Sequence, residues 1–195
     1  MKKVKFYYGM SGAMKGTTIK KLEEDDWKTM YSAIKRWKAY EFGLFSGLSP
    51  GCDLNFGMLH LIRLEDFLES CTAEKIIIER GITDSMFYYL YSDEFGERHS
   101  LSDDVIKKAI KVENDLLKDY EVQRILLIQK DEGFIRTHVL NEPFRKKTFK
   151  DNTKYYLEMQ EKYVNHTLKF EKMDEVIEIK NAKDYLESLG IEFKY

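Results

Sequence analysis

The sequence predicts a three-layer α/β/α fold around a mostly parallel sheet of about five strands. Short, continuous apolar runs recur along the chain, and helical patterns separate them. Continuous apolar runs are typical of strands that are buried on both faces, and helical crossovers connect parallel strands. A glycine-containing loop also follows the first run directly. Such a loop lies at the carboxyl end of a strand, where open parallel sheets bind their ligands.

The predicted strands are rich in β-branched and aromatic residues. They cover Val4 to Tyr8, Lys75 to Ile78 and Val122 to Ile128, and a weaker run adds Val176 to Ile179. In the segment 25–50 we expect a short helix over Trp27 to Ile34 and a further strand near Trp37 to Phe42.

Helices are predicted between the strands from the three-to-four spacing of apolar residues and from capping residues. They span Phe56 to Cys71, Ser102 to Tyr120, Asn152 to Phe170 and Ala182 to Leu189. Gly190 is a typical C-terminal stop for the last of these helices.

The composition favours a single domain over residues 1–195, because the chain is 43% hydrophobic but short for two cores. The net charge of -2 predicts no global field that would attract nucleic acid or an anionic membrane. No apolar run approaches the roughly 20 residues that cross a bilayer, so we expect no membrane segment. Cys52 and Cys71 lack CxxC spacing and a histidine cluster. We therefore expect no zinc site and a cytoplasmic location.

The loop after the first strand begins a segment, GMSGAMKGTTIKKL, that runs from Gly9 to Leu22 and leads into a basic helix. A phosphate-binding loop needs glycines that let backbone N–H groups turn inward, a helix N-terminus, and a lysine that reaches the β- and γ-phosphates. The segment therefore predicts an ATP site with Lys15 as its central cation. The expected ATP contacts are Gly9, Ser11, Gly12, Ala13, Met14, Lys15, Gly16, Thr17 and Thr18.

Two positions of this loop depart from the strict pattern GxxxxGK[ST]. Met14 stands where the second glycine is expected, and Gly16 stands where the magnesium-binding hydroxyl is expected. Thr17 is the nearest hydroxyl that could bind Mg²⁺ instead. The plain alternative is an ordinary glycine-containing turn between a strand and a helix.

A second group of polar residues ends the strand that begins at Lys75, in the sequence KIIIERGITDS. Charges at the carboxyl end of a parallel strand face the ligand crevice. Glu79 could hold magnesium or accept a proton from an attacking hydroxyl, and Arg80 could bind a phosphate. The alternative is a strand end whose polar residues meet solvent.

With these residues, the chain resembles the thymidylate kinase and deoxynucleoside kinase group of P-loop kinases. Those proteins have DRY or ERS at this strand end, followed in thymidylate kinases by a TDSS-like stretch and an aromatic helix. The resemblance is strongest at residues 4–22, 75–90 and 122–165. It implies a P-loop NTPase fold, ATP and Mg²⁺ as cofactors, and an acceptor contact at Arg80, with Ser85 and Tyr88 near the acceptor pocket.

The basic segment at about 132–152 is expected to form a lid, because mobile arginines can close over phosphates and exclude water. By resemblance, Arg136 and Arg145 match a helix arginine and a lid arginine. Most charge runs are only a solvated face, which is the alternative here.

The resemblance implies three further features. Arg63 would reach the acceptor phosphate from its helix, although a lone arginine is more often an exposed residue. Asn181, with Lys180 and Ala182, would flank the adenine of ATP. A homodimer is also suggested by the resemblance.

The leading functional prediction is transfer of the ATP γ-phosphate to a nucleoside monophosphate, such as dTMP. The first alternative is a deoxynucleoside kinase, which needs a carboxylate base such as Glu41 or Glu79. The second alternative is a nucleotide-binding protein whose catalytic site has decayed, because Met14 and Gly16 depart from the loop pattern.

Overall fold

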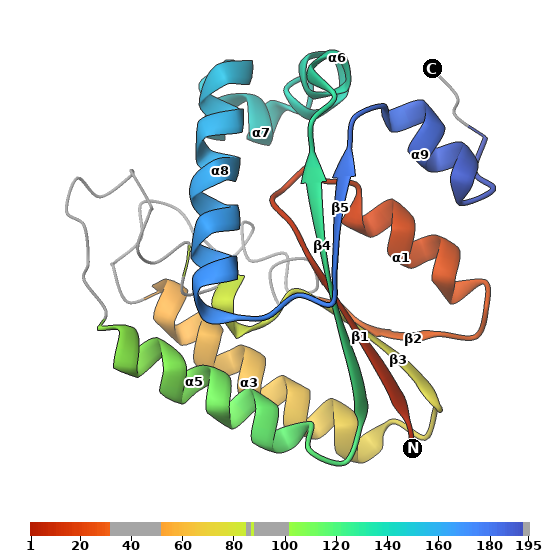
Figure 1. The fold of residues 1–195 in the computed structure, drawn as a ribbon, viewed down its shortest axis with the longest axis vertical. Helices are drawn as coiled ribbons and strands as arrows, with labels where there is room; N and C mark the ends of the chain where they lie inside the picture. The colour runs from red at the N-terminus through yellow and green to blue at the C-terminus, as the bar shows by residue number, and fades with distance from the viewer. Residues whose placement is uncertain (32–51, 85–86, 88–101, 193–195) are drawn as a thin grey trace.

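The computed structural model describes residues 1–31, 52–84, 87 and 102–192. They form a five-stranded, all-parallel sheet in the order β2-β3-β1-β4-β5, with helices on both faces (Figure 1). The strands are β1 (Lys3–Tyr8), β2 (Lys28–Met30), β3 (Lys75–Glu79), β4 (Glu121–Gln129) and β5 (Glu175–Ile179). The helices are α1 (Lys15–Glu23), α3 (Cys52–Ser70), α5 (Asp103–Leu116), α6 (Glu132–Phe134), η2 (Ile135–Val139, a π-helix), α7 (Pro143–Thr148), α8 (Thr153–Phe170) and α9 (Ala182–Ser188).

The alternation of side chains along the central strand builds two cores. Phe6 and Tyr8 of β1 point into the larger cluster, and Tyr7 between them points into the smaller cluster. Helices α3, α5 and α8 cover the first face, and α1 and α9 cover the second (Figure 1). Because both faces are covered, the strands are continuous apolar runs. The predicted three-layer fold is confirmed.

The strand predictions at Val4, Lys75, Val122 and Val176 are confirmed within one residue at each start. The helix expected from Trp27 is wrong over its first part, since Lys28–Met30 is the strand β2. These three residues pair in parallel with Ile76, Ile77 and Ile78 of β3. Pairing with a neighbouring strand therefore overrides the local helical pattern. The strand expected at Trp37 to Phe42 lies outside the described residues.

The helices predicted from Phe56, Ser102, Asn152 and Ala182 are present, with changes at their ends. The helix expected to reach Tyr120 ends at Leu116, because a turn follows in which the Tyr120 amide bonds to the Leu117 carbonyl. Within the described part of the chain, none of the helices combines the length and apolar character needed to span a bilayer.

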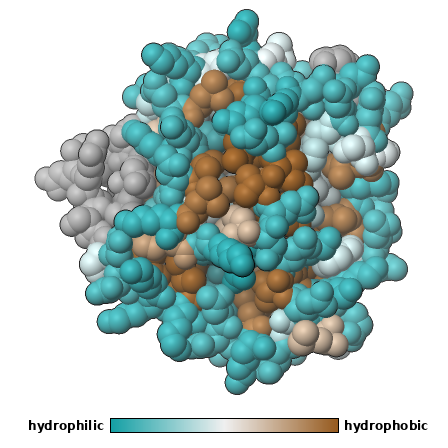
Figure 2. Space-filling view, viewed as in Figure 1, coloured by the Kyte–Doolittle hydropathy of each residue, from teal (hydrophilic) through white to brown (hydrophobic). Residues whose placement is uncertain are grey.

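Apolar side chains reach the surface between α8 and β5 (Figure 2). Leu168 of α8 and Val176 of β5 are about half exposed there, at 47% and 48%. Strand β5 is an edge of the sheet. Because Ile177 and Ile179 of β5 point into the smaller cluster, Val176 lies on the side of the larger cluster, where this edge is partly exposed.

The strand order reverses direction at β1. From β1 the chain proceeds to β2 and β3 on one side, and it then crosses to β4 and β5 on the other. In open parallel sheets, the crevice at such a switch point, at the carboxyl ends of the strands, is the usual ligand site. The loop after β1 occupies this position.

Candidate active site

The loop from Gly9 to Lys15, which is predicted to bind phosphate, depends on two glycines for its backbone path. Gly9 and Gly12 have φ values of 144° and 92°, which side chains rarely adopt. A Cβ at Gly9 would lie 2.7 Å from the Leu127 carbonyl oxygen, and one at Gly12 would lie 2.6 Å from a Val139 methyl. The loop therefore packs tightly between β4 and η2 at two positions where only glycine fits.

Met14 occupies the position of the missing second glycine, and it adopts the left-handed conformation that this position requires, with φ 62°. Its side chain is buried in the smaller apolar cluster with Ile19 and Trp27. The methionine therefore anchors the loop to the core beside α1.

Lys15 is almost fully buried at the start of α1. Its ammonium group donates hydrogen bonds to the Gly9 and Met10 carbonyls, the latter at 3.0 Å. The cation is thus held inside the curve of the loop, where an anion would meet it. This arrangement fits a triphosphate.

The two threonines after Gly16 have different surroundings. The Thr18 hydroxyl is buried and bonds to the Met14 carbonyl at 3.1 Å and to the Tyr185 hydroxyl of α9 at 2.9 Å. Thr17 is exposed in the first turn of α1. Of the two hydroxyls, Thr17 is therefore the one open to a ligand from solvent.

Side chains from α7 and α8 hold the loop from the other side. Arg145 Nε donates to the Ser11 hydroxyl at 3.0 Å, and the Tyr156 hydroxyl donates to the Ser11 carbonyl at 3.0 Å. The Tyr163 hydroxyl accepts a hydrogen bond from the Gly9 amide at 3.0 Å. The basic segment is therefore in contact with the loop, with Arg145 as its reaching cation.

Strand β3 ends in the second group of predicted residues. Glu79 is buried, and Arg80 after it has a left-handed backbone with φ 72°. Arg80 Nη1 donates to Asp84 Oδ1 at 3.2 Å. Asp84 is itself buried, and its Oδ2 has no hydrogen-bond partner within the described residues. Burial, and then the negative charge of Asp84, raise the pKa of Tyr163, so the two polar groups are neighbours.

Arg63 lies on α3 and donates to the Tyr31 carbonyl just after β2, at 3.0 Å. Burial, the hydrogen bond to Glu23, and the charges of Glu23 and Glu79 raise the pKa of Tyr31 to about 12. Arg63 and Tyr31 therefore border the Glu79 end of β3.

The predicted adenine-flanking loop is linked to the start of α6. Asn181 caps α9 by accepting from the Lys183 and Asp184 amides. Asp131 accepts from the Ala182 amide and from the Phe134 amide, each at 2.9 Å. Burial opposes ionisation of Asp131, but these backbone N–H groups outweigh it and lower its pKa.

The structure thus gathers most of the predicted residues at the carboxyl end of the sheet. Arg136 is exposed on η2, the same short helix whose Val139 packs on Gly12. Ser85, Tyr88 and Glu41 lie outside the described residues. Among the described residues there is no cluster of three or more His, Cys, Asp or Glu side chains that could hold a metal ion. Magnesium bound with nucleotide needs few protein ligands, because phosphate oxygens and water supply the rest.

Sequence reasoning missed three residues that support this site: Tyr156, Tyr163 and Asp84. The two tyrosines are seven residues apart and so lie on one face of α8. That spacing was a usable signal. Asp84 lies in the TDSS-like stretch, but that resemblance did not predict its ion pair with Arg80, four residues earlier.

Together, the central loop, its buried lysine and the all-parallel sheet define the fold of the P-loop kinases. A solved structure of thymidylate kinase from Candida albicans is similar to this chain, with a TM-score of 0.62 and 12% sequence identity, covering 97% of this chain and 89% of that one. At this identity the likeness shows the fold. No protein-family model matches the sequence, and no curated protein matches it.

Proposed function

We propose that this protein is an ATP-dependent phosphotransferase that phosphorylates a nucleoside monophosphate. The observation that supports it most is the loop from Gly9 to Lys15, whose glycine geometry and buried ammonium suit a triphosphate. In this proposal Lys15 binds the β- and γ-phosphates. The whole-chain likeness to a thymidylate kinase supports the same class of reaction.

Of the remaining predicted residues, some would bind the phosphate donor, ATP, and others would bind the acceptor. Arg145 leaves Ser11 for the transferred phosphate, and Arg136 joins it from η2; their charges stabilise the transition state. Arg80 and Arg63 bind the acceptor, together with Ser85 and Tyr88. Asn181 borders the adenine. Magnesium, held by Thr17 and by Glu79 through water, would neutralise phosphate charge.

The choice of a monophosphate acceptor follows from the balance of charges. In this proposal two arginines, Arg63 and Arg80, serve the acceptor, and a phosphate oxygen needs little deprotonation before it attacks. The deoxynucleoside kinase alternative is favoured by one observation, the buried Glu79 beside Arg80, since a carboxylate there could accept a proton from a sugar hydroxyl.

Purified protein with ATP and Mg²⁺ should be tested against a panel of nucleosides and nucleoside monophosphates, with products separated by chromatography. A diphosphate product from one or more monophosphates is expected. A monophosphate product from a nucleoside would establish the alternative instead. Absence of product from the whole panel would show that the protein is not a kinase of either kind.

Lys15→Ala should lower kcat/KM by about a hundredfold or more, because it removes charge that acts on the transferred phosphate. Lys20→Ala is the matched control, since Lys20 is exposed on the same helix. Equal kinetics for the two variants would contradict the assignment of Lys15.

A further inference from the structure

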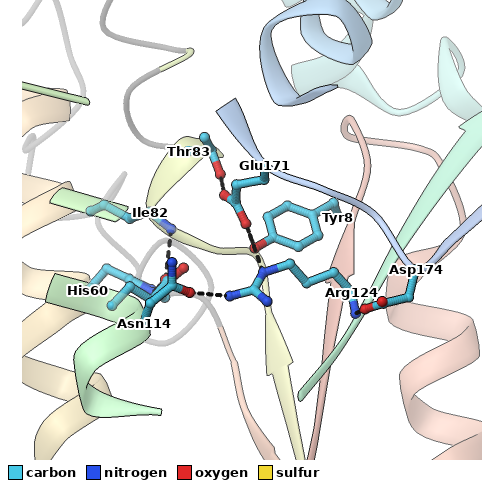
Figure 3. A network of polar contacts seen from close by, with 9 residues as sticks. Tyr8, His60, Ile82, Thr83, Asn114, Arg124, Glu171 and Asp174 are labelled. Carbon is cyan, nitrogen blue, oxygen red and sulfur yellow. Dashed lines mark hydrogen bonds and ion pairs between the residues drawn. The ribbon is translucent and has the colours of Figure 1, made fainter. Parts of the chain in front are cut away.

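The segment after β3 that carries Arg80 and Asp84 is anchored at Ile82 and Thr83 by a buried polar network (Figure 3). The Ile82 amide donates to Glu113 Oε1 at 3.0 Å. The Thr83 hydroxyl donates to Glu171 Oε1. Ile82 and Thr83, the first two helical residues after Gly81, are therefore bonded to two carboxylates from different parts of the chain, α5 and the end of α8.

Each carboxylate is tied to further elements. Glu171 Oε2 accepts from the Tyr8 hydroxyl at 2.6 Å and from Arg124 Nε at 3.0 Å. Glu113 Oε1 lies 2.7 Å from His60 Nε2. Because a carboxylate oxygen only accepts, His60 Nε2 is the donor. Strands β1 and β4 and helices α3 and α5 thus all fix the turn.

The turn itself needs such support. The left-handed backbone of Arg80 costs free energy for any residue other than glycine and persists only where the surroundings enforce it. The next residue, Gly81, passes over Tyr8 so closely that a Cβ would lie 2.4 Å from the tyrosine hydroxyl oxygen. The same tyrosine hydroxyl bonds to Glu171, so Tyr8 joins the polar network to the segment at Gly81.

The network contains two buried carboxylates and one permanent cation, Arg124. Burial, and then the charge of Glu113, raise the pKa of Glu171 to about 8. The groups that face Glu171 are Tyr8 from β1, Thr83 from the turn, Arg124 from β4 and Glu113 from α5. Loss of the proton leaves two close negative charges in a dry environment, and both carboxylates bond to the segment after β3, at Ile82 and Thr83.

We propose that Glu113 and Glu171 are positioning residues for the acceptor, because they hold Ile82 and Thr83 and thereby set the orientation of Arg80 and Asp84. This inference rests on the proposed function for the acceptor role of Arg80. The phosphate loop has its own anchors on α7 and α8, at Arg145 and Tyr156. Disturbing the two glutamates should therefore affect the acceptor more than ATP.

Steady-state kinetics between pH 6.5 and 9 test the inference. The acceptor KM of the wild type should rise severalfold as the pH passes about 8, while the KM for ATP stays nearly constant. Glu171→Gln should keep the low acceptor KM across the range, since an amide retains both an acceptor and a donor and cannot ionise. Glu171→Ala should raise the acceptor KM about tenfold at every pH. Glu161→Gln, an exposed change on α8, is the control.

Thr83→Val replaces the hydroxyl that bonds to Glu171 with a methyl group. This variant replaces Glu171→Ala in the test if Glu171→Ala does not fold. It should raise the acceptor KM and leave the KM for ATP unchanged. Parallel changes in the two KM values, or a wild-type pH dependence retained in Glu171→Gln, would overturn the inference.

A measurement without turnover separates this inference from the proposed function. In nucleotide-free protein, the NMR shifts of the Ile82 and Thr83 amides should follow the titration of the Glu171 carboxyl carbon, with one midpoint near pH 8. A Glu171 that titrates like an exposed glutamate, or amides that ignore its titration, would overturn the inference even in an active kinase. The amides could follow the titration of Glu171 in a protein that phosphorylates none of the acceptors. That result would support the anchoring of Ile82 and Thr83 by the two glutamates and would contradict the proposed kinase activity.

Discussion

Met14 departs from the glycine of the loop pattern but still adopts the left-handed backbone conformation at that position. The position needs a left-handed backbone, which costs about 1–2 kcal/mol for a residue with a Cβ. The methionine adopts that conformation and buries its side chain among Ile19 and Trp27. Packing therefore offsets the backbone strain, and the loop retains its shape without the second glycine.

The backbone strain and the side-chain packing at Met14 can be measured separately by substitution. Met14→Ala loses the buried side chain but keeps the strain, and it should destabilise the fold by about 2–4 kcal/mol. Met14→Gly loses the same packing but relieves the strain, so it should be about 1 kcal/mol more stable than the alanine variant. Chemical denaturation measures both. An alanine variant as stable as the glycine variant would show that the backbone is not strained at this position.

Among the elements, helix α8 both covers the sheet and shapes the loop that is proposed to bind phosphate. Tyr156 and Tyr163 are fully buried, and both hydroxyls bond to the loop backbone, at Ser11 and Gly9. The loop is thus pre-formed by a helix that follows it by more than 140 residues in the chain. A pre-formed loop would not have to be ordered at the expense of the proposed nucleotide binding.

The two tyrosines should differ in importance. Tyr163→Phe leaves the buried Gly9 amide without its acceptor, which should cost about 1–3 kcal/mol of stability and weaken ATP binding. Tyr156→Phe removes a donor from a partly buried carbonyl, and its cost should be nearer 0.5–1.5 kcal/mol. Thermal unfolding and nucleotide titration measure these effects. Tyr120→Phe, beside the opposite end of β4, is the control and should change neither.

At the scale of the whole molecule, two buried groups make stability depend on pH in opposite directions. Burial lowers the pKa of His166, which packs between Phe87 and Phe170, to about 4. Burial and Glu113 raise the pKa of Glu171 to about 8. Between pH 4 and 6.5 the unfolded chain binds a proton at His166 that the folded chain does not. Between pH 4.5 and 8 the folded chain holds a proton at Glu171 that the unfolded chain lacks.

The sign of each effect gives a prediction for thermal unfolding. The two effects oppose each other between pH 4.5 and 6.5. Above this window, stability should fall as the pH rises towards 8, by up to about 1.4 kcal/mol per pH unit, because only the Glu171 effect remains. Glu171→Gln should flatten this alkaline fall, and the exposed change Glu161→Gln should preserve it. A wild type whose stability is level from pH 6.5 to 8 would contradict the raised pKa.

Local sequence patterns are enough to predict the fold class and the position of the glycine-containing loop after β1. Apolar continuity from Val4 to Tyr8 and at Lys75 to Ile78 reflects burial on both sheet faces, which is a local property of each strand. The glycine spacing around Lys15 is equally local, since adjacent residues build the loop. The tertiary structure alone decided that Lys28–Met30 is a strand, because its partner on β3 is distant in the chain. It also decided that Arg145, Tyr163 and Glu171 meet the loop and the β3 turn. Contacts between residues far apart in sequence depend on how the layers pack, and no local pattern encodes them.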